Sequence, residues 1–239
     1  MRSSADVQTF QDTAAWADAC TERLTETLRQ AIQAAGRAVF AGSGGSTPAP
    51  IYRRMASSEL DWSAVVATLI DERYVPETSP QSNAALLKST LLTGRAAAAR
   101  FVPLFSPQVT VDRAAAVAAH ALAAEGGRFD AVLLGMGEDG HICSMFPESP
   151  TLRTLLSPRL SPTVLGVPTG RDGRGPTLER LSINLPYLIG ARRVVLAISG
   201  KQKRAVFERE AAGDPAIHPI AALLAHGVKL DVLWTEQPA

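Results

Sequence analysis

Five short, mostly apolar segments separated by helical patterns constrain the fold of this chain more than any other feature. Each segment has the length of a strand. Each also contains too few polar residues for one face of the strand to be exposed to solvent, so both faces are expected to be buried. The segments are residues 38–41, 65–70, 130–134, 194–198 and 230–234. Before and between them, apolar side chains recur at helical spacing in residues 13–35, 83–92, 111–125 and 201–212. Buried strands that alternate with helices indicate βαβ units, so the sequence predicts an α/β fold with a mainly parallel sheet and helices on both faces.

The length and composition predict one domain. The 239 residues, 46% of them hydrophobic and 20% charged, suffice for one large α/β domain, and we assign residues 1–239 to it. Residues 157–176 are rich in proline and glycine. We interpret them as an ordered excursion or a mobile loop, because the α/β pattern resumes after them.

Charge and cysteine content argue against several classes of protein. The formal net charge of +1 predicts no general attraction to nucleic acid or to acidic membranes. Cys20 and Cys143 lie far apart and show no metal-ligand spacing, which argues against a disulfide framework and a structural zinc site. The sequence shows neither a secretory signal nor an apolar run long enough to span a membrane. We therefore expect a cytoplasmic protein, as a monomer or a small homo-oligomer.

Polar and glycine-rich clusters follow four of the five predicted strands. Ligands of open α/β sheets bind outside the carboxyl ends of the strands, so we expect these clusters to converge on one crevice. The first cluster is Gly42-Ser43-Gly44-Gly45-Ser46-Thr47-Pro48. Glycines let backbone N–H groups approach an anion, and we expect Thr47 to cap a helix that begins at Pro48. Such a helix start is suited to phosphate, although a plain strand-to-helix turn has the same pattern.

The same turn is one residue short of a nucleophile elbow, in which Ser43 would attack substrate with His141 as its base. Two features argue against this alternative. Ala41 replaces the first glycine of the motif, and the elbow normally follows several strands rather than the first.

Two further clusters carry ionisable side chains. Asp71-Glu72-Arg73 follows the second predicted strand and is interpreted as a solvated loop or the edge of a site. The segment from Leu134 to Pro147 contains three glycines in six residues, which place Asp139 and His141 on one compact loop. Histidine is the natural proton acceptor near neutral pH, and a neighbouring carboxylate can orient its ring. We therefore expect catalysis at this loop, where the alternative is a structurally hydrogen-bonded histidine.

The remaining candidates are two cations near the fourth predicted strand. Arg180 offers a planar fork that matches phosphate, and Lys203 offers a point charge. His120, His218 and His226 have no partner pattern and are interpreted as structural.

Together these clusters resemble the 6-phosphogluconolactonase family, which is related to the glucosamine-6-phosphate deaminases and has a modified Rossmann-like α/β fold. The resemblance extends from about residue 36 to near the end of the chain. It is carried by SGGSTP at 43–48, DERYVP at 71–76 with Ser82-Asn83 following, LLGMGEDGHICSMFP at 133–147 and RLSINLPYLIGARRVVLAISGKQK at 180–203.

The resemblance implies hydrolysis of 6-phospho-D-glucono-1,5-lactone to 6-phosphogluconate, a step of the oxidative pentose phosphate pathway, without a metal or an organic cofactor. His141 would be the general base that activates water, Asp139 would support it, and Arg73 would lie near the substrate's hydroxyls or carboxylate end. Candidate oxyanion donors are Arg73 and the N–H groups around residues 137–140. The 6-phosphate and the rest of the substrate would be held by Ser43, Gly44, Gly45, Ser46, Thr47, Asp71, Arg180 and Lys203.

The related deaminases remain the main alternative. Their loop has a glutamate five residues after the histidine, whereas this chain has Phe146 there, and a phenylalanine cannot transfer a proton. The chain also departs from the lactonase pattern at Ile142-Cys143, where threonine and alanine are commoner, and in a proline-rich approach to Arg180 that is reduced to Gly175-Pro176. A third alternative is a sugar-phosphate sensor that binds phosphosugars without converting them.

Overall fold

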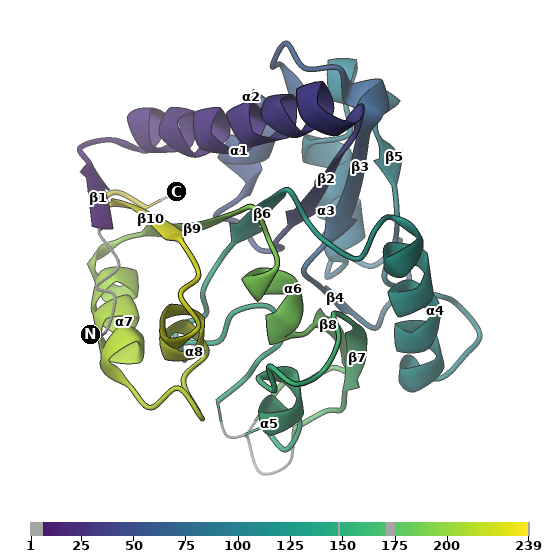
Figure 1. Ribbon diagram of the computed structural model, residues 1–239. Coiled ribbons are helices and arrows are strands. Elements are labelled where there is room, and N and C mark those ends of the chain that lie inside the picture. The colour runs from purple at the N-terminus through teal and green to yellow at the C-terminus, as the bar shows by residue number, and fades with distance from the viewer. Residues whose placement is uncertain (1–6, 148, 171–174, 239) are drawn as a thin grey trace.

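The computed structural model describes residues 7–147, 149–170 and 175–238. Residues 1–6 and 239 of the predicted domain, and residues 171–174 of the predicted excursion, lie outside the described residues. A seven-stranded sheet and a three-stranded sheet form the framework (Figure 1).

The large sheet is entirely parallel and has the order β1-β10-β9-β6-β2-β3-β5. Numbered along the chain from β2, its six successive strands have the order 3-2-1-4-5-6 of a Rossmann fold, and β1 adds a seventh beside β10. The predicted α/β class and parallel sheet are therefore confirmed. The strands are β1 (Val7–Phe10), β2 (Ala38–Gly42), β3 (Val65–Leu69), β5 (Arg100–Phe101), β6 (Ala131–Leu134), β9 (Arg193–Ser199) and β10 (Leu230–Thr235).

Helices cover both faces of this sheet. Helix α1 crosses one face over β2, β6, β9 and β10, and α6, α7 and α8 lie on the opposite side (Figure 1). The helices are α1 (Thr13–Ala35), α2 (Ala49–Ala56), α3 (Asn83–Thr90), α4 (Val111–Ala124), α5 (Leu152–Leu155), α6 (Leu185–Ile189), α7 (Lys201–Ala212) and α8 (Pro219–Ala225), with short 3-10 turns at Trp62–Ala64 and Gly94–Ala98. None of the helices in the described ranges is long and apolar enough to cross a membrane.

Helix α1 shows how the sequence sets these elements. Asp12 caps its start by accepting a hydrogen bond from the Ala15 amide, and Gly36 ends it with a φ of 70°. The buried stripe includes Trp16, whose indole N–H donates to the Leu233 carbonyl at 3.0 Å. The helix is thereby fixed to β10 on the sheet beneath it.

The strand order places a crevice between β2 and β6. From β2 the chain builds outward through β3 to β5, and then crosses back to lay β6 on the other side of β2. This reversal is the topological switch point, where the loops after neighbouring strands diverge and leave room for a ligand. Since β9, β6, β2 and β3 are adjacent and parallel, the four polar clusters that follow them meet at one edge, as predicted.

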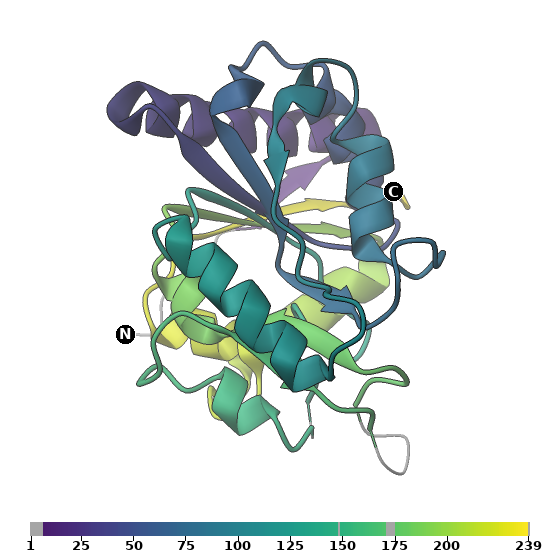
Figure 2. The same ribbon diagram turned by 90° about the vertical axis from the view of Figure 1, so that its right-hand side faces the viewer.

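The sequence did not predict the second sheet. It is antiparallel with the order β4-β8-β7 and consists of β4 (Asp71–Arg73), β7 (Val164–Val167) and β8 (Arg180–Ile183). Strand β4 follows β3 after a single residue, and β7 lies within the predicted excursion. Helix α4 packs against β7 and β8 (Figure 2). This sheet brings β4 and β8 to the same edge of the crevice.

Candidate active site

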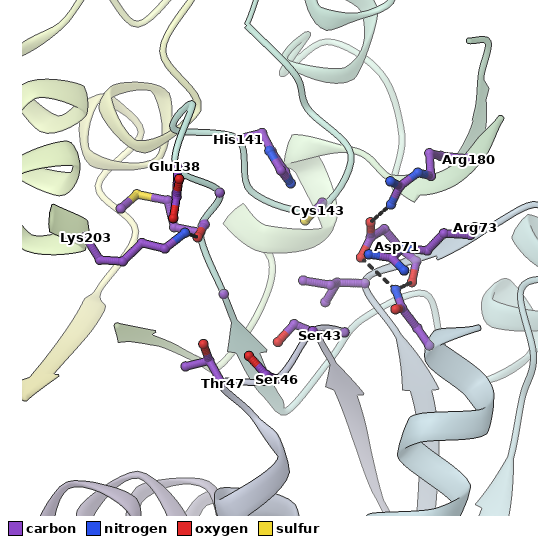
Figure 3. Close-up of a pocket in the computed structure, with 17 residues that line it drawn as sticks. Ser43, Ser46, Thr47, Asp71, Arg73, Glu138, His141, Cys143, Arg180 and Lys203 are labelled. Carbon is purple, nitrogen blue, oxygen red and sulfur yellow. Dashed lines mark hydrogen bonds and ion pairs between the residues drawn. The ribbon is translucent and has the colours of Figure 1, made fainter. Parts of the chain in front are cut away.

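A cavity of about 340 Å³ lies at the switch point (Figure 3). Every residue predicted for the site lines it except Asp139, which contacts the lining residue His141. Several residues that were not predicted also line it. The complete lining is Ser43, Gly44, Gly45, Ser46, Thr47, Ile70, Asp71, Arg73, Asn83, Gly135, Met136, Gly137, Glu138, His141, Cys143, Arg180 and Lys203.

The glycine-rich loop after β2 forms the floor of the cavity. Gly44 passes so close to the Asn83 side chain that a Cβ there would lie 1.8 Å from the Asn83 Oδ1, and Gly45 has a φ of 88°. Only glycine suits these two positions. The predicted cap by Thr47 is wrong: helix α2 begins at Ala49 and Pro48 precedes it without a side-chain capping bond. The Thr47 side chain lines the cavity instead (Figure 3).

The cluster after β3 is not a solvated loop, because Asp71 is only 6% exposed and Glu72 is fully buried. Glu72 accepts hydrogen bonds from the backbone amides of Arg73, Asn83 and Ala84 at 2.7–2.8 Å and from the Ser82 hydroxyl at 3.1 Å. Burial raises the pKa of the Glu72 carboxyl, and these hydrogen bonds oppose that rise. Glu72 thus ties β4 to the start of α3 and fixes the residues on either side of it.

Asp71 is held in the cavity by three side chains, and for two of them, Ser144 and Asn83, no role was predicted. Its carboxylate accepts a hydrogen bond from the Ser144 hydroxyl at 2.7 Å, and the Asn83 side-chain amide donates to its carbonyl oxygen at 2.9 Å. The Arg180 guanidinium lies 3.9 Å from the same carboxylate. Ser144 lies on the loop after β6 and Asn83 at the start of α3, so Asp71 links three elements around the cavity.

Arg73 and Arg180 face each other across the antiparallel ladder between β4 and β8. The Nε atom of each is buried and has no hydrogen-bond partner among the described residues, and the same is true of the Ser43 hydroxyl. Burial lowers the pKa of Arg180, and the neighbouring charge of Arg73 adds to this, whereas Asp71 and Glu72 oppose it. The residues that bear these three unpaired donors all line the cavity, and two of them are cations, which suits an oxygen-rich anionic ligand.

The loop after β6 carries the Asp139–His141 pair. The His141 Nδ1 lies 2.6 Å from the Asp139 Oδ1, and the His141 amide also donates to that oxygen at 3.2 Å. Burial raises the pKa of Asp139, but the hydrogen bonds and charge of His141 outweigh this effect and leave it below its ordinary value. An ionised carboxylate can only accept, so Nδ1 carries the proton and Nε2 is left as the basic nitrogen.

Glycines and one aromatic ring set the orientation of His141. A Cβ on Gly137 would lie 2.2 Å from the His141 Nδ1, and Gly140 has a φ of 91°. The Phe146 ring packs on the imidazole with its centre 4.2 Å away, and the Arg180 guanidinium lies 5.7 Å from the same ring. Phe146 therefore packs against both side chains.

Two of the expected oxyanion donors are engaged within this loop. The Gly137 amide donates to the His141 carbonyl at 2.8 Å, and the Gly140 amide donates to the Gly137 carbonyl at 3.2 Å. The expectation that these two amides face substrate is therefore wrong, because the tight turn that presents His141 consumes them. Among the other expected donors, Arg73 donates from Nη1 to the Gln81 carbonyl at 2.8 Å, and its Nε has no partner in the described part of the chain.

Lys203 lies on the opposite side of the cavity from Arg73 and Arg180, with His141 between them (Figure 3). Its ammonium donates to the Met136 carbonyl at 2.5 Å. Burial lowers the pKa of Lys203, and the charges of Glu138 and Asp139 oppose this. The cavity therefore presents cations at two ends and a basic nitrogen in between.

Covalent catalysis by Ser43 or Cys143 has little support in this geometry. A nucleophile elbow requires a hydrogen bond between Ser43 and its base, and in the described structure the Ser43 hydroxyl has none. Burial and the charge of Asp71 raise the pKa of the Cys143 thiol, which keeps it protonated. Across the described ranges, no three His, Cys, Asp or Glu side chains are grouped so that they could hold a metal ion.

Comparisons with known proteins agree with the fold. Residues 11–234 match the model of the family described as glucosamine-6-phosphate isomerases/6-phosphogluconolactonase. The 6-phosphogluconolactonase of Rhizobium meliloti is 40% identical over 97% of this chain and 99% of its own, and that of Caulobacter vibrioides is 40% identical over 92% of each. The crystal structure of a 6-phosphogluconolactonase from Shewanella baltica has a TM-score of 0.89 and 31% identity, covering 98% of this chain and 99% of that one. This chain therefore belongs to the glucosamine-6-phosphate isomerase/6-phosphogluconolactonase family.

Proposed function

We propose that this protein hydrolyses 6-phospho-D-glucono-1,5-lactone to 6-phosphogluconate in the cytoplasm, with His141 as the general base. The observation that carries the proposal is the cavity in which unpaired donors of Ser43, Arg73 and Arg180 accompany an imidazole oriented by Asp139. Relatives that carry the name 6-phosphogluconolactonase and match nearly the whole chain support the choice of substrate.

A δ-lactone is an activated ester, so the reaction needs placement more than strong chemistry. The basic Nε2 of His141 takes a proton from water as the water oxygen attacks the lactone carbonyl carbon. The bond between this carbon and the ring oxygen then breaks, and the protonated His141 returns the proton to the departing oxygen. Asp139 stabilises the charged imidazole between the two transfers. Arg73 donates to the oxyanion, and neither a metal nor an organic cofactor takes part.

The 6-phosphate gives the binding energy that positions the carbonyl. In our proposal it lies over the loop formed by Ser43, Gly44, Gly45, Ser46 and Thr47, whose amides and hydroxyls can donate to it. Arg180 and Lys203 flank this loop from the two sides of the cavity (Figure 3). Asp71 accepts hydrogen bonds from the sugar hydroxyls.

Deamination of glucosamine 6-phosphate is the strongest competing function within the same family. That reaction needs an additional proton-transferring side chain five residues after the histidine, where this chain has Phe146. Phe146 is 7% exposed and packs on His141, so it fills this position without ionisable chemistry. Release of ammonia from glucosamine 6-phosphate would favour the deaminase.

Product binding tests the proposed site directly. Calorimetry is expected to show that 6-phosphogluconate binds and that gluconate, which lacks the phosphate, binds far more weakly. Labelling of Ser43 by a fluorophosphonate would favour a serine hydrolase instead. Binding of phosphosugars without turnover of any lactone would favour a sensor.

A further inference from the structure

Helix α7 contacts the catalytic loop, residues 135–141, at two points. Lys203 and Glu210 are seven residues apart, which is about two helical turns, so they share one face of α7. Lys203 donates to the Met136 carbonyl near the start of the loop, and Glu210 lies against Gly140 near its end. The helix therefore runs alongside the loop and supports both of its ends.

The second contact is unusually close. Gly140 has a φ of 91°, and a Cβ at this position would lie 2.3 Å from the Glu210 carboxyl carbon and 2.6 Å from its Oε1. The loop backbone thus rests directly on the carboxylate, which is only 2% exposed. Gly140 is also the residue between Asp139 and His141, so any movement there changes the orientation of both.

The Glu210 carboxylate is fixed from its other sides. The His218 Nδ1 lies 2.8 Å from its Oε2, and the Arg209 guanidinium lies 3.0 Å from its Oε1. His218 is backed in turn by Gly213, where a Cβ would lie 2.3 Å from the His218 ring. These partners offset the cost of burying the charge and confine the carboxylate to one place.

We propose that Glu210 is a positioning residue. Its carboxylate packs against Gly140, prevents the loop backbone from shifting, and so sets the geometry of the Asp139–His141 pair. Glu210 does not line the cavity, so it acts on turnover only through the loop. The expected effect of Glu210 on turnover rests on the proposed function of His141, whereas its effect on the conformation of the loop does not depend on that function.

The size and shape of the side chain at position 210 determine which substitutions keep the loop in place. Glu210→Ala removes the carboxyl group that packs against Gly140, so the loop backbone can shift. A misplacement of about 1 Å in a catalytic group can lower the rate on the order of 10²-fold. We expect kcat to fall about 10- to 100-fold with little change in KM. Glu210→Gln has almost the same shape and can still accept from His218. Its NH₂ group then faces Arg209, but the Arg209 side chain is exposed and can turn to solvent, unlike the backbone donors around Glu72, so this variant should restore most of kcat. Glu208→Ala is the control, because Glu208 lies on the same helix, is exposed and forms a surface ion pair with Arg204.

Nitrogen NMR of the histidine side chains gives a measurement that does not need turnover. The His141 signals are assigned with His141→Asn, and the Nδ1 proton bonded to Asp139 reports the geometry of the pair. We expect this signal to be preserved in Glu210→Gln and Glu208→Ala and to be broadened or lost in Glu210→Ala.

If Glu210→Ala does not fold, Glu210→Asp replaces it, since it keeps the charge but withdraws the carboxylate by one methylene. The proposal predicts a reduced kcat and an altered His141 signal in Glu210→Asp, while Glu210→Gln keeps a kcat and a His141 signal close to those of the wild type. Wild-type kcat and an unchanged His141 signal in the shortened variants would overturn it. If the wild-type protein does not hydrolyse the lactone, the proposed function fails, and the His141 signal still decides the role of Glu210.

Discussion

Arg73 and Arg180 lie directly opposite each other in the β4–β8 ladder, and the Nε atom of each is buried without a partner among the described residues. Like charges at such positions destabilise a ladder, and a bound anion offsets their repulsion. The fold therefore keeps two cations close together despite their repulsion, and a bound anion would relieve this destabilisation. Such an arrangement is typical of a functional site.

This relationship predicts stabilisation by product. A ligand at about 100 times its Kd stabilises the native state by roughly 2.7 kcal/mol, so 6-phosphogluconate should raise the Tm clearly and gluconate should raise it little. In Arg180→Gln the rise should be largely lost. Thermal unfolding with and without each ligand checks this, and an equal rise in the variant would argue against an anion at Arg180.

His141→Asn removes the base and keeps a side chain of similar size. Turnover of the lactone should fall about 10²- to 10⁴-fold, while the affinity for 6-phosphogluconate stays close to that of the wild type. Single-substrate kinetics and calorimetry measure the two quantities separately. Retention of full activity would exclude His141 as the base.

Asp139→Asn should lower kcat because an amide can hold His141 in the wrong tautomer. The effect on stability depends on pH. The pKa of Asp139 lies below its ordinary value in the folded protein, so its ionised form stabilises the fold above about pH 4, and this contribution is lost as the pH falls through the lower folded pKa. The Tm difference between wild type and variant should therefore shrink in strong acid. A difference that grows on acidification would contradict this account.

Glu72→Gln should destabilise the protein. Each oxygen of Glu72 faces a backbone N–H, so in either orientation the new NH₂ group meets a donor and leaves hydrogen bonds unmade. The expected cost is about 1–3 kcal/mol in the free energy of unfolding, measured by denaturant titration. Glu77→Gln is the matched control on the surface, where the ion pair with Lys88 contributes little. Equal stabilities of the two variants would show that the hydrogen bonds of Glu72 to the start of α3 do not stabilise the fold.

Lys203→Met should weaken binding of the phosphorylated lactone more than it slows chemistry. A hydrogen bond to a charged group is worth about 1.5–3 kcal/mol, so KM should rise roughly 10- to 100-fold. Lys201→Met is the control, because Lys201 starts the same helix but is exposed and paired with Glu236. If KM stays the same for Lys203→Met, the phosphate does not lie near Lys203.

The five central strands of the main sheet were predictable because they are largely buried and their apolar runs are strong signals, whereas the partly exposed edge strands β1 and β5 were not predicted. All five predicted strands are present, and helices α1 and α7 have the predicted bounds. The small sheet was not predictable from periodicity, since β4 is the charged tripeptide Asp71-Glu72-Arg73. Its burial depends on hydrogen bonds from α3 and from Ser144, which no local pattern reveals.

The lining of the candidate cavity was largely predictable as a set of residues, but its arrangement was not. Glycine spacing and strand ends brought His141, Ser43 and Arg73 together correctly, because clusters after adjacent parallel strands must meet. The contacts that orient them were missed. Asn83 beside Gly44, and Glu210 beneath Gly140, act through close approaches between segments distant in the chain, and a single sequence carries no signal for such contacts.

The most direct test of the central claim is the rate of acid release from freshly generated 6-phosphogluconolactone, compared with the spontaneous rate and with unphosphorylated gluconolactone. The account predicts strong acceleration for the phosphorylated lactone, little for the unphosphorylated one, and loss of the acceleration in His141→Asn. A rate equal to the spontaneous rate for the phosphorylated lactone would contradict it.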